Sequence, residues 1–263
     1  MSADTALRSE NDEPTIIKQY RNKKYKVAGF EIVKPERKPE TTSLTDLPDR
    51  QKYTAETGHM AVQPLRTAEE IEKAKEYFLN KPERYKGQNI RDWCIFIFGI
   101  NLARRAGDLL HLRVHNVLNS DGTVREKICI KEQKTGKSAI MIVTPTIKDA
   151  LELYLSGKKN INPSEPLFPS RVKDKAGNYK AMTVTNFYLK MQGLKEELDL
   201  SVPLGTHSMR KTWAYQLLKN NPDNPNIMVA ASKVLNHSSV AVTMRYIGQY
   251  QEEIDETLMK SQL

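Results

Sequence analysis

The chain has 263 residues, 39% of them hydrophobic, which is enough for a sizeable core. No uninterrupted apolar run approaches the length of a membrane span, and the first residues lack the layout of a signal peptide, so we expect a cytoplasmic protein without a membrane partner. The 41 Lys and Arg side chains outnumber the 32 Asp and Glu side chains, and the net charge of +9 favours a polyanionic partner without identifying it.

The sequence has none of the spacings typical of metal sites or nucleotide-binding loops. The patterns CxxC, HExxH and GxxxxGK(S/T) do not occur, so we expect no metal and no cofactor. The two cysteines, Cys94 and Cys129, stand in apolar segments typical of inert core thiols. We therefore expect both to be reduced and buried.

Residues 1–66 predict an irregular, charged N-terminal arm rather than a folded domain, because prolines interrupt a polar sequence that has little periodicity. Within this arm, residues 18–26 alternate basic and aromatic side chains. Lys23, Lys24 and Lys26 could bind nucleic-acid phosphates there, while a solvated tail explains the same residues equally well.

Two helices are expected after the arm. Thr67 and Glu70 predict a capping box at the start of the first helix, and Pro82 ends it. Residues 89–102 predict the second helix, and their continuous apolar run at 93–97 is typical of a helix in the middle of a core.

Residues 124–130 and 138–143 predict a β-hairpin, because both segments are short and rich in β-branched residues. Thr144 and Pro145 predict the start of the next helix. A polar stretch follows as far as Lys180, without a predicted element. Further helices are expected at 184–198, 208–219, 228–235 and 240–246, so the fold class is α+β, mainly α-helical, with a small β-sheet.

Residues with reactive side chains occur at intervals along these elements and the segments that join them. In chain order they are Arg105, Lys134, His207, Arg210, His237 and Tyr246. This order of Arg, Lys, His-x-x-Arg, His and Tyr resembles the tyrosine recombinases, the phage integrase family, over residues 67–246. The resemblance implies a catalytic domain at 67–246, with residues 247–263 forming a tail or helix that a neighbouring subunit can bind.

The residue types suit phosphoryl transfer on DNA. A tyrosine that attacks a phosphodiester builds negative charge on two non-bridging oxygens, and Arg105 and Arg210 would neutralise this charge. Tyr246 is a weak nucleophile at neutral pH, so it needs a base or nearby cations, and His207 is our candidate base. We assign phosphate hydrogen bonding to His237.

Lys134 is our candidate general acid for the departing 5′ oxygen, because the family places a lysine just before the turn of this hairpin. Lys131 and Lys137 are rivals for that role and are otherwise candidate DNA contacts, together with Lys211 and Arg245. Asp108 matches the acidic residue that follows the first arginine in the family, and we expect it to orient an arginine.

The resemblance further implies a reaction without cofactor, in which a 3′-phosphotyrosyl link forms and a free 5′ hydroxyl attacks a second duplex to give a Holliday junction. Family members act on double-stranded DNA as tetramers, so a homo-tetramer is expected. An accessory DNA-bending or directionality factor is also possible. Integration, excision, inversion and resolution remain open.

Three features depart from the family pattern. Asn236 and Ala103 stand where glycine is usual, and residues 1–66 are too short and irregular for the usual N-terminal core-binding domain. Two other functions also remain open. A type IB topoisomerase uses the same tyrosine chemistry, although it commonly has lysine in place of His207. A DNA-binding regulator could retain the fold without cutting, although it would have no need for Tyr246.

Overall fold

The structure is a computed structural model that describes residues 62–81, 87–156, 158, 161–200, 203–247, 259 and 261, with only the backbone described for Arg245 and Ile247. These residues belong to one compact unit that begins at Val62. Most of the expected arm, including Lys23, Lys24 and Lys26, therefore lies outside the described residues.

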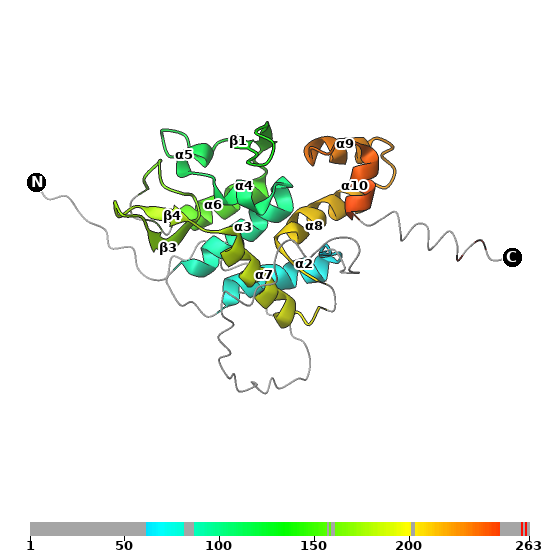
Figure 1. The fold of residues 1–263 in the computed structure, drawn as a ribbon, viewed down its shortest axis with the longest axis horizontal. Coiled ribbons are helices and arrows are strands. Elements are labelled where there is room, and N and C mark those ends of the chain that lie inside the picture. The colour runs from blue at the N-terminus through cyan, green and yellow to red at the C-terminus, as the bar shows by residue number, and fades with distance from the viewer. Residues whose placement is uncertain are drawn as a thin grey trace, which may run out of the picture. The chain divides into compact units, whose positions relative to one another are not determined.

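The described elements are mainly helices, with two short hairpins inserted between them (Figure 1). This arrangement confirms the mainly helical α+β class expected from the sequence. In chain order the elements are α2 (Ala68–Asn80), α3 (Gln88–Leu102), α4 (Ala106–Leu110), α5 (Val114–Val117), β1 (Lys127–Lys131), β2 (Ser138–Ile142), α6 (Pro145–Ser156), β3 (Pro169–Lys173), β4 (Tyr179–Ala181), α7 (Val184–Glu197), α8 (Thr206–Lys219), α9 (Ile227–Val234) and α10 (Val240–Ile247).

Helix α3 forms the centre of the core. Every residue from Asp92 to Gly99 is buried, and α3 contacts α2, α6 and α8. It packs tightly against α8 at Gly99, where an added Cβ atom would lie 2.2 Å from the sulfur of Met209. A helix that is apolar around its circumference is buried on all sides, as the sequence predicted for this segment.

The start of α2 also agrees with prediction. The Thr67 side chain accepts a hydrogen bond of 3.0 Å from the backbone amide of Glu70, and the Glu70 carboxylate accepts one of 3.0 Å from the amide of Thr67. This reciprocal capping box satisfies two amides that the first turn leaves unpaired.

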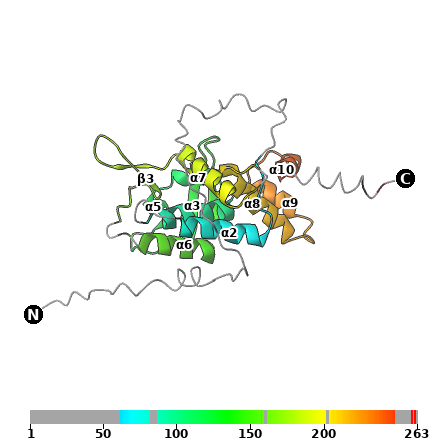
Figure 2. The same ribbon diagram turned by 90° about the horizontal axis from the view of Figure 1, so that it is seen from below.

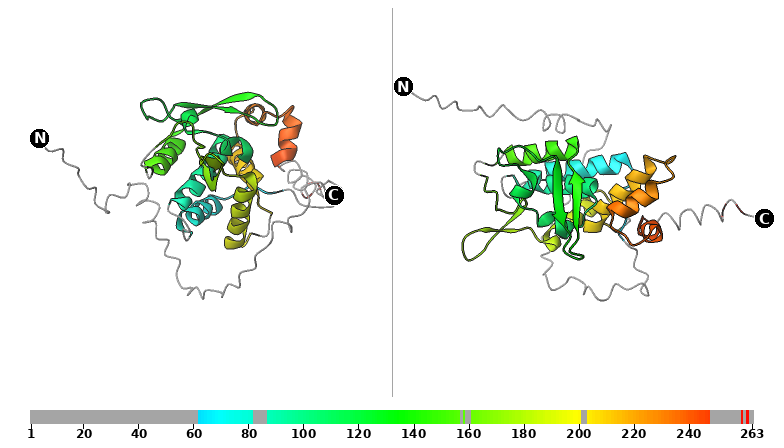
Figure 3. Two further views of the ribbon diagram at one scale, coloured as in Figure 1. Left: turned by 60° about the vertical axis from the view of Figure 1, so that its left-hand side comes forward. Right: turned by 90° about the horizontal axis from the view of Figure 1, so that it is seen from above.

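Strands β1 and β2 form the expected antiparallel hairpin, with Lys127 opposite Ile142 and Lys131 opposite Ser138. Both panels of Figure 3 show this hairpin lying across one face of the helices. A second hairpin, β3 with β4, was not predicted, because its exposed residues have no apolar alternation. The short helices α4 and α5 were not predicted either, since neither is long enough to show helical periodicity.

The expectation for Cys129 is wrong. Cys94 is buried in α3, but Cys129 is exposed. The reason is the twofold alternation of β1, in which Ile128 and Ile130 face the core and Cys129 faces outward. Burial raises the pKa of the Cys94 thiol well above its usual value.

No helix in the described part of the chain is both long and apolar enough to cross a membrane. Within the same residues, no group of three or more His, Cys, Asp or Glu side chains is arranged to hold a metal ion.

Candidate active site

Arg104 and Arg105 occupy the turn between α3 and α4. Ala103 ends α3 with a φ of 54°, in the left-handed region, and Arg105 is the N-cap residue of α4. The turn directs Arg104 into the interior, where its side chain is 2% exposed, while the side chain of Arg105 remains 25% exposed. Arg104 is therefore an interior residue of the site, and Arg105 lies at its surface.

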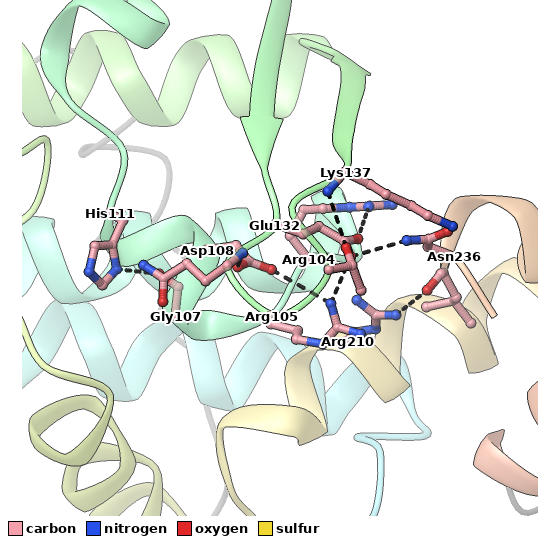
Figure 4. Close-up of polar contacts among 12 residues, drawn as sticks. Arg104, Arg105, Gly107, Asp108, His111, Glu132, Lys137, Arg210 and Asn236 are labelled. Atoms are coloured by element: carbon pink, nitrogen blue, oxygen red, sulfur yellow. Dashed lines mark hydrogen bonds and ion pairs between the residues drawn. The ribbon is translucent and has the colours of Figure 1, made fainter.

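The carboxylate of Glu132 binds both arginines (Figure 4). Its Oε1 accepts a hydrogen bond of 3.0 Å from Arg104, and its Oε2 accepts one of 2.9 Å from Arg105. The same Oε2 also accepts hydrogen bonds from the Thr135 hydroxyl at 2.8 Å and from the Asn236 side-chain amide at 3.1 Å. Glu132 therefore joins three segments that are distant in sequence.

The side chain of Glu132 is buried, with 1% exposed, yet it remains ionised. Burial alone would raise its pKa, but the hydrogen bonds from Thr135, Asn236 and Arg105 and the charge of Arg105 outweigh burial and hold the pKa to about 2. The site therefore contains a permanent negative charge at neutral pH.

Asp108, the expected arginine-orienting residue, is also buried. One carboxylate oxygen accepts a hydrogen bond of 2.9 Å from the backbone amide of Gln133, and the other lies 3.9 Å from the guanidinium of Arg105. Asp108 thus attaches the β1–β2 turn to α4 and stands beside Arg105.

Helix α8 places His207 and Arg210 three residues apart, in its first turns. Arg210 is buried, and its Nη2 donates a hydrogen bond to the carbonyl of Leu235 at the end of α9. Its Nη1 is also buried, and among the described residues it has no hydrogen-bond partner. His207 is exposed, so it stands where solvent or a ligand can reach it.

Tyr246 lies in α10, which contacts α8 and α9, and Figure 2 shows these three helices grouped together. The His237 ring meets the Tyr246 ring edge to face, with centroids 5.1 Å apart. The Arg210 guanidinium carbon lies 6.0 Å from the centroid of the Tyr246 ring. The Lys211 ammonium lies 5.2 Å from the same centroid.

His237 is held by two polar contacts of its own. Its backbone amide donates to the carbonyl of Ser232 at 3.0 Å, and its Nδ1 lies 2.9 Å from the Thr243 hydroxyl. These contacts orient the ring toward α10. The structure therefore brings His237, Arg210 and Tyr246 together.

Burial and charge shift the ionisation of these groups. Burial raises the pKa of Tyr246 to about 12, although the charges of Arg210 and Arg105 act to lower it. Desolvation by the surrounding protein, followed by the charges of Arg210 and Arg105, lowers the pKa of His207 below 6.5. The pKa of His237 falls for the same reasons. Both histidines are therefore neutral at pH 7, and Tyr246 is protonated.

The lysines of the β1–β2 turn are exposed. Lys131, Lys134 and Lys137 have no described ion pair, and the charge of Lys134 contributes to the lowered pKa of His207. Lys134 is thus within electrostatic range of the site without a direct contact. Lys211, expected as a surface DNA contact, is instead buried beside Tyr246. The side chain of Arg245 lies outside the description.

Sequence reasoning missed Glu132, Arg104 and the side-chain role of Asn236. A signal for Glu132 existed, because it continues the inward series of Ile128 and Ile130 along β1 and so places a carboxylate on the buried side. Arg104 had no comparable signal, because it follows a left-handed residue whose conformation could not be predicted from alanine.

A model of the phage integrase family matches residues 67–253 of the chain. The chain belongs to the phage integrase family. Within this family it is 34% identical, over 188 residues, to the probable integrase/recombinase YoeC of Bacillus subtilis (strain 168), covering 71% of this chain and 90% of that protein. What it shares with this family is the catalytic domain of a tyrosine-type site-specific recombinase.

Two solved recombinase structures have a similar fold. XerA recombinase superposes with a TM-score of 0.54 at 19% identity, covering 78% of this chain and 66% of that chain. XerH, solved bound to its palindromic difH substrate in a post-cleavage complex, superposes with a TM-score of 0.53 at 18% identity, covering 78% and 55%. The chain therefore spans less than two thirds of the length of these two recombinases.

Proposed function

We propose that the protein cuts and rejoins double-stranded DNA at specific sites, with Tyr246 as the nucleophile. The observation that carries this proposal is the grouping of Arg210, His237 and Lys211 around the partly buried Tyr246 side chain, whose hydroxyl is itself buried. A tyrosine needs neighbouring cations to stabilise its phenolate and the phosphate that it attacks, and an ordinary packing tyrosine does not.

In the first step the Tyr246 oxygen forms a bond to the scissile phosphorus, and the bond from phosphorus to the 5′ oxygen breaks. Negative charge develops on the two non-bridging oxygens, where the guanidinium groups of Arg105 and Arg210 stabilise it. The partnerless Nη1 of Arg210 supports this role, because a phosphate oxygen would supply the acceptor that it lacks.

Proton transfer accompanies both bond changes. His207, neutral at pH 7, takes the proton of the Tyr246 hydroxyl, whose high pKa makes a base necessary. Lys134 gives a proton to the departing 5′ oxygen, and His237 donates a hydrogen bond to the phosphate. Asp108 orients Arg105.

The product is a 3′-phosphotyrosyl link and a free 5′ hydroxyl. The hydroxyl of a second duplex attacks this link, which releases Tyr246 and produces a Holliday junction after one pair of exchanges. The phosphodiester bond energy is retained in the covalent link, so the cycle needs no nucleotide hydrolysis.

We further propose that residues 67–246 form the catalytic domain, and the family match over 67–253 supports its first boundary. The preceding arm, through Lys23, Lys24 and Lys26, and the exposed Lys131 and Lys137 would bind backbone phosphates. Residues 247–263 would bind a neighbouring subunit in a homo-tetramer on paired sites in the cytoplasm. The DNA complex of XerH supports DNA as the partner.

The experiment is covalent trapping. The wild type, Tyr246→Phe and Tyr215→Phe are incubated with fragmented host and element DNA and denatured, and the protein-linked fragments are sequenced. Tyr215 is the matched control, because it packs in the same cluster as Tyr246. We expect adducts at a recurring site for the wild type and Tyr215→Phe, and none for Tyr246→Phe.

Other outcomes would replace the proposal. Adducts that persist in Tyr246→Phe would show that another residue is the nucleophile. No adduct from any protein, with salt-sensitive DNA binding retained, would favour a DNA-binding regulator. Relaxation of supercoiled plasmid without recombinant product would favour a type IB topoisomerase.

A further inference from the structure

The carboxylate of Glu132 lies beside the proposed reaction centre without any described contact to Tyr246, His207 or His237. Its position is nevertheless central, because each of its partners belongs to a segment that carries a reactive residue (Figure 4). It has a side-chain exposure of 1%, so solvent cannot replace these contacts if the carboxylate is lost.

Each contact fixes a different part of the site. Arg105, bound at 2.9 Å, is itself a proposed phosphate ligand. Thr135, bound at 2.8 Å, directly follows Lys134 in the hairpin turn. Asn236, bound at 3.1 Å, directly precedes His237. Through these contacts, one side chain fixes the position of Arg105 directly and those of Lys134 and His237 through their sequence neighbours.

The negative charge suits this task. A guanidinium has five N–H donors, so Arg105 can bind Glu132 through Nη1 and still present other donors to a phosphate. Without Glu132, the buried Arg104 would lose its described carboxylate partner, and a buried unpaired charge is costly. The contacts of Glu132 therefore hold Arg104 and Arg105 in place from within the protein.

We propose that Glu132 is a positioning residue for DNA cleavage, whose charged carboxylate aligns Arg105, the Lys134 turn and the His237 loop. This role rests on the proposed function. It predicts that loss of the charge slows cleavage far more than it weakens DNA binding, because phosphate contacts elsewhere on the surface remain.

The test compares Glu132→Gln with Glu126→Gln, a matched loss of charge at an exposed position just before the same hairpin. The DNA site recovered by trapping is the substrate, and single-turnover adduct formation and DNA affinity are measured separately. We expect Glu132→Gln to slow adduct formation roughly 10²-fold, the scale of a small misplacement of catalytic groups. Its affinity should change less than about threefold, and Glu126→Gln should match the wild type.

A substrate with a methylphosphonate at the scissile position separates positioning from general damage. The methyl group removes one charged oxygen and so reduces the need for an aligned arginine. We expect the defect of Glu132→Gln to shrink on this substrate, and to add little when Arg105→Ala is already present. An equal defect on both substrates, or additive losses, would overturn the proposal in favour of a purely structural role.

Asn236→Gly gives a second test in case Glu132→Gln does not fold. Glycine suits the φ of 53° at this position, so the substitution removes the contact to Glu132 without backbone strain. We expect a smaller, several-fold loss of cleavage rate, and an unchanged rate would count against the proposal. If the wild type itself forms no adduct, the proposed function fails together with this role. If the wild type is active and Glu132→Gln equals it, only the role of Glu132 fails.

Discussion

The protein around them shifts the ionisation of both Tyr246 and His207, burial acting mainly on the tyrosine and desolvation with the neighbouring charges of Arg210 and Arg105 acting on the histidine. The tyrosine has a pKa raised to about 12, so almost none of it is phenolate at neutral pH. The histidine has a lowered pKa, so it is neutral and able to accept a proton. The opposite shifts suit a pair in which His207 takes the proton of Tyr246 at the moment of attack.

This pairing predicts the pH dependence of cleavage. The rate constant kcat/KM reports the free enzyme, and it should fall only as the pH drops below 6.5, because the neutral His207 persists down to its lowered pKa. The fall of kcat at acid pH should occur at a higher pH than the fall of kcat/KM, since a bound phosphate favours the charged form of His207. Initial cleavage rates between pH 5 and 8 provide the measurement.

His207→Gln should abolish the fall of the cleavage rate at acid pH and slow cleavage by about 10²-fold or more. His111→Gln is the control, because His111 is an exposed histidine whose ring contacts the carbonyl of Gly107. A fall at acid pH that survives in His207→Gln would assign the base to another group, with His237 the first alternative.

The general acid can be identified with a substrate whose 5′ bridging oxygen is replaced by sulfur. A thiolate leaves without protonation, because thiols are far more acidic than alcohols. Lys134→Ala should slow cleavage of the ordinary substrate by roughly 10²-fold or more, yet cleave the sulfur substrate nearly as fast as the wild type. If Lys131→Ala or Lys137→Ala shows this rescue instead, that lysine is the acid.

At the scale of elements, two packed helices deliver the arginines. The turn after α3 carries Arg105 and the second turn of α8 carries Arg210, so the separation of these helices sets the separation of the guanidinium groups. Gly99 allows the close approach, because an added Cβ atom would lie 2.8 Å from the Cβ of Met209, which cannot move independently of the α8 backbone.

Gly99→Ala should therefore lower the free energy of unfolding by about 1–3 kcal/mol, the usual cost of overpacking a core, and should slow cleavage at temperatures where the protein stays folded. Gly107→Ala in α4 is the control, since its Cβ would meet atoms no closer than 3.6 Å. Urea unfolding and single-turnover cleavage are the measurements. Equal stability of Gly99→Ala and the wild type would mean that Met209 repacks without cost.

Local signals predicted the elements that depend on local interactions. The capping box at Thr67, the apolar run of α3 and the β-branched residues of β1 each lie within a few residues, and each element was predicted to within a few residues of its bounds. The β3–β4 hairpin is exposed and irregular, so hydrophobic periodicity could not predict it.

The site also has parts that the sequence predicted and parts that it could not predict. The reactive residues were recognised by their order along the chain, whereas the contacts of Glu132 depend on tertiary structure. Asn236 lies 104 positions from Glu132, and Arg104 lies 28 positions from it. Ala103 and Asn236, which stand where glycine is usual in the family, have left-handed backbone conformations with φ of 54° and 53°, and glycine adopts this conformation readily.

At the scale of the whole molecule, Glu132 links acid stability to the site. Its pKa in the fold is about 2, below its ordinary value of 4.5, so its ionised form stabilises the fold above pH 4.5. This stabilisation, at most about 3 kcal/mol, is lost as the pH falls from about 4.5 toward 2.

Urea unfolding at several pH values between 7 and 3 tests this link. The wild type should lose stability steeply in the acid range, whereas Glu132→Gln should be less stable at pH 7 and should approach the wild type at low pH. Parallel pH profiles for the two proteins would contradict the prediction and assign acid unfolding to other carboxylates.

The Tyr246 hydroxyl and the Nη1 of Arg210 are both buried, and within the described residues neither makes a hydrogen bond of good geometry, although a weaker interaction with Arg210 helps to lower the pKa of Tyr246. Each such group costs the free protein about 1–3 kcal/mol. A DNA phosphate that accepted a hydrogen bond from Arg210 would offset part of this cost, so bound DNA would stabilise the folded protein. The same buried polar atoms would then affect both thermal stability and DNA affinity. The protein would be most stable when DNA is bound.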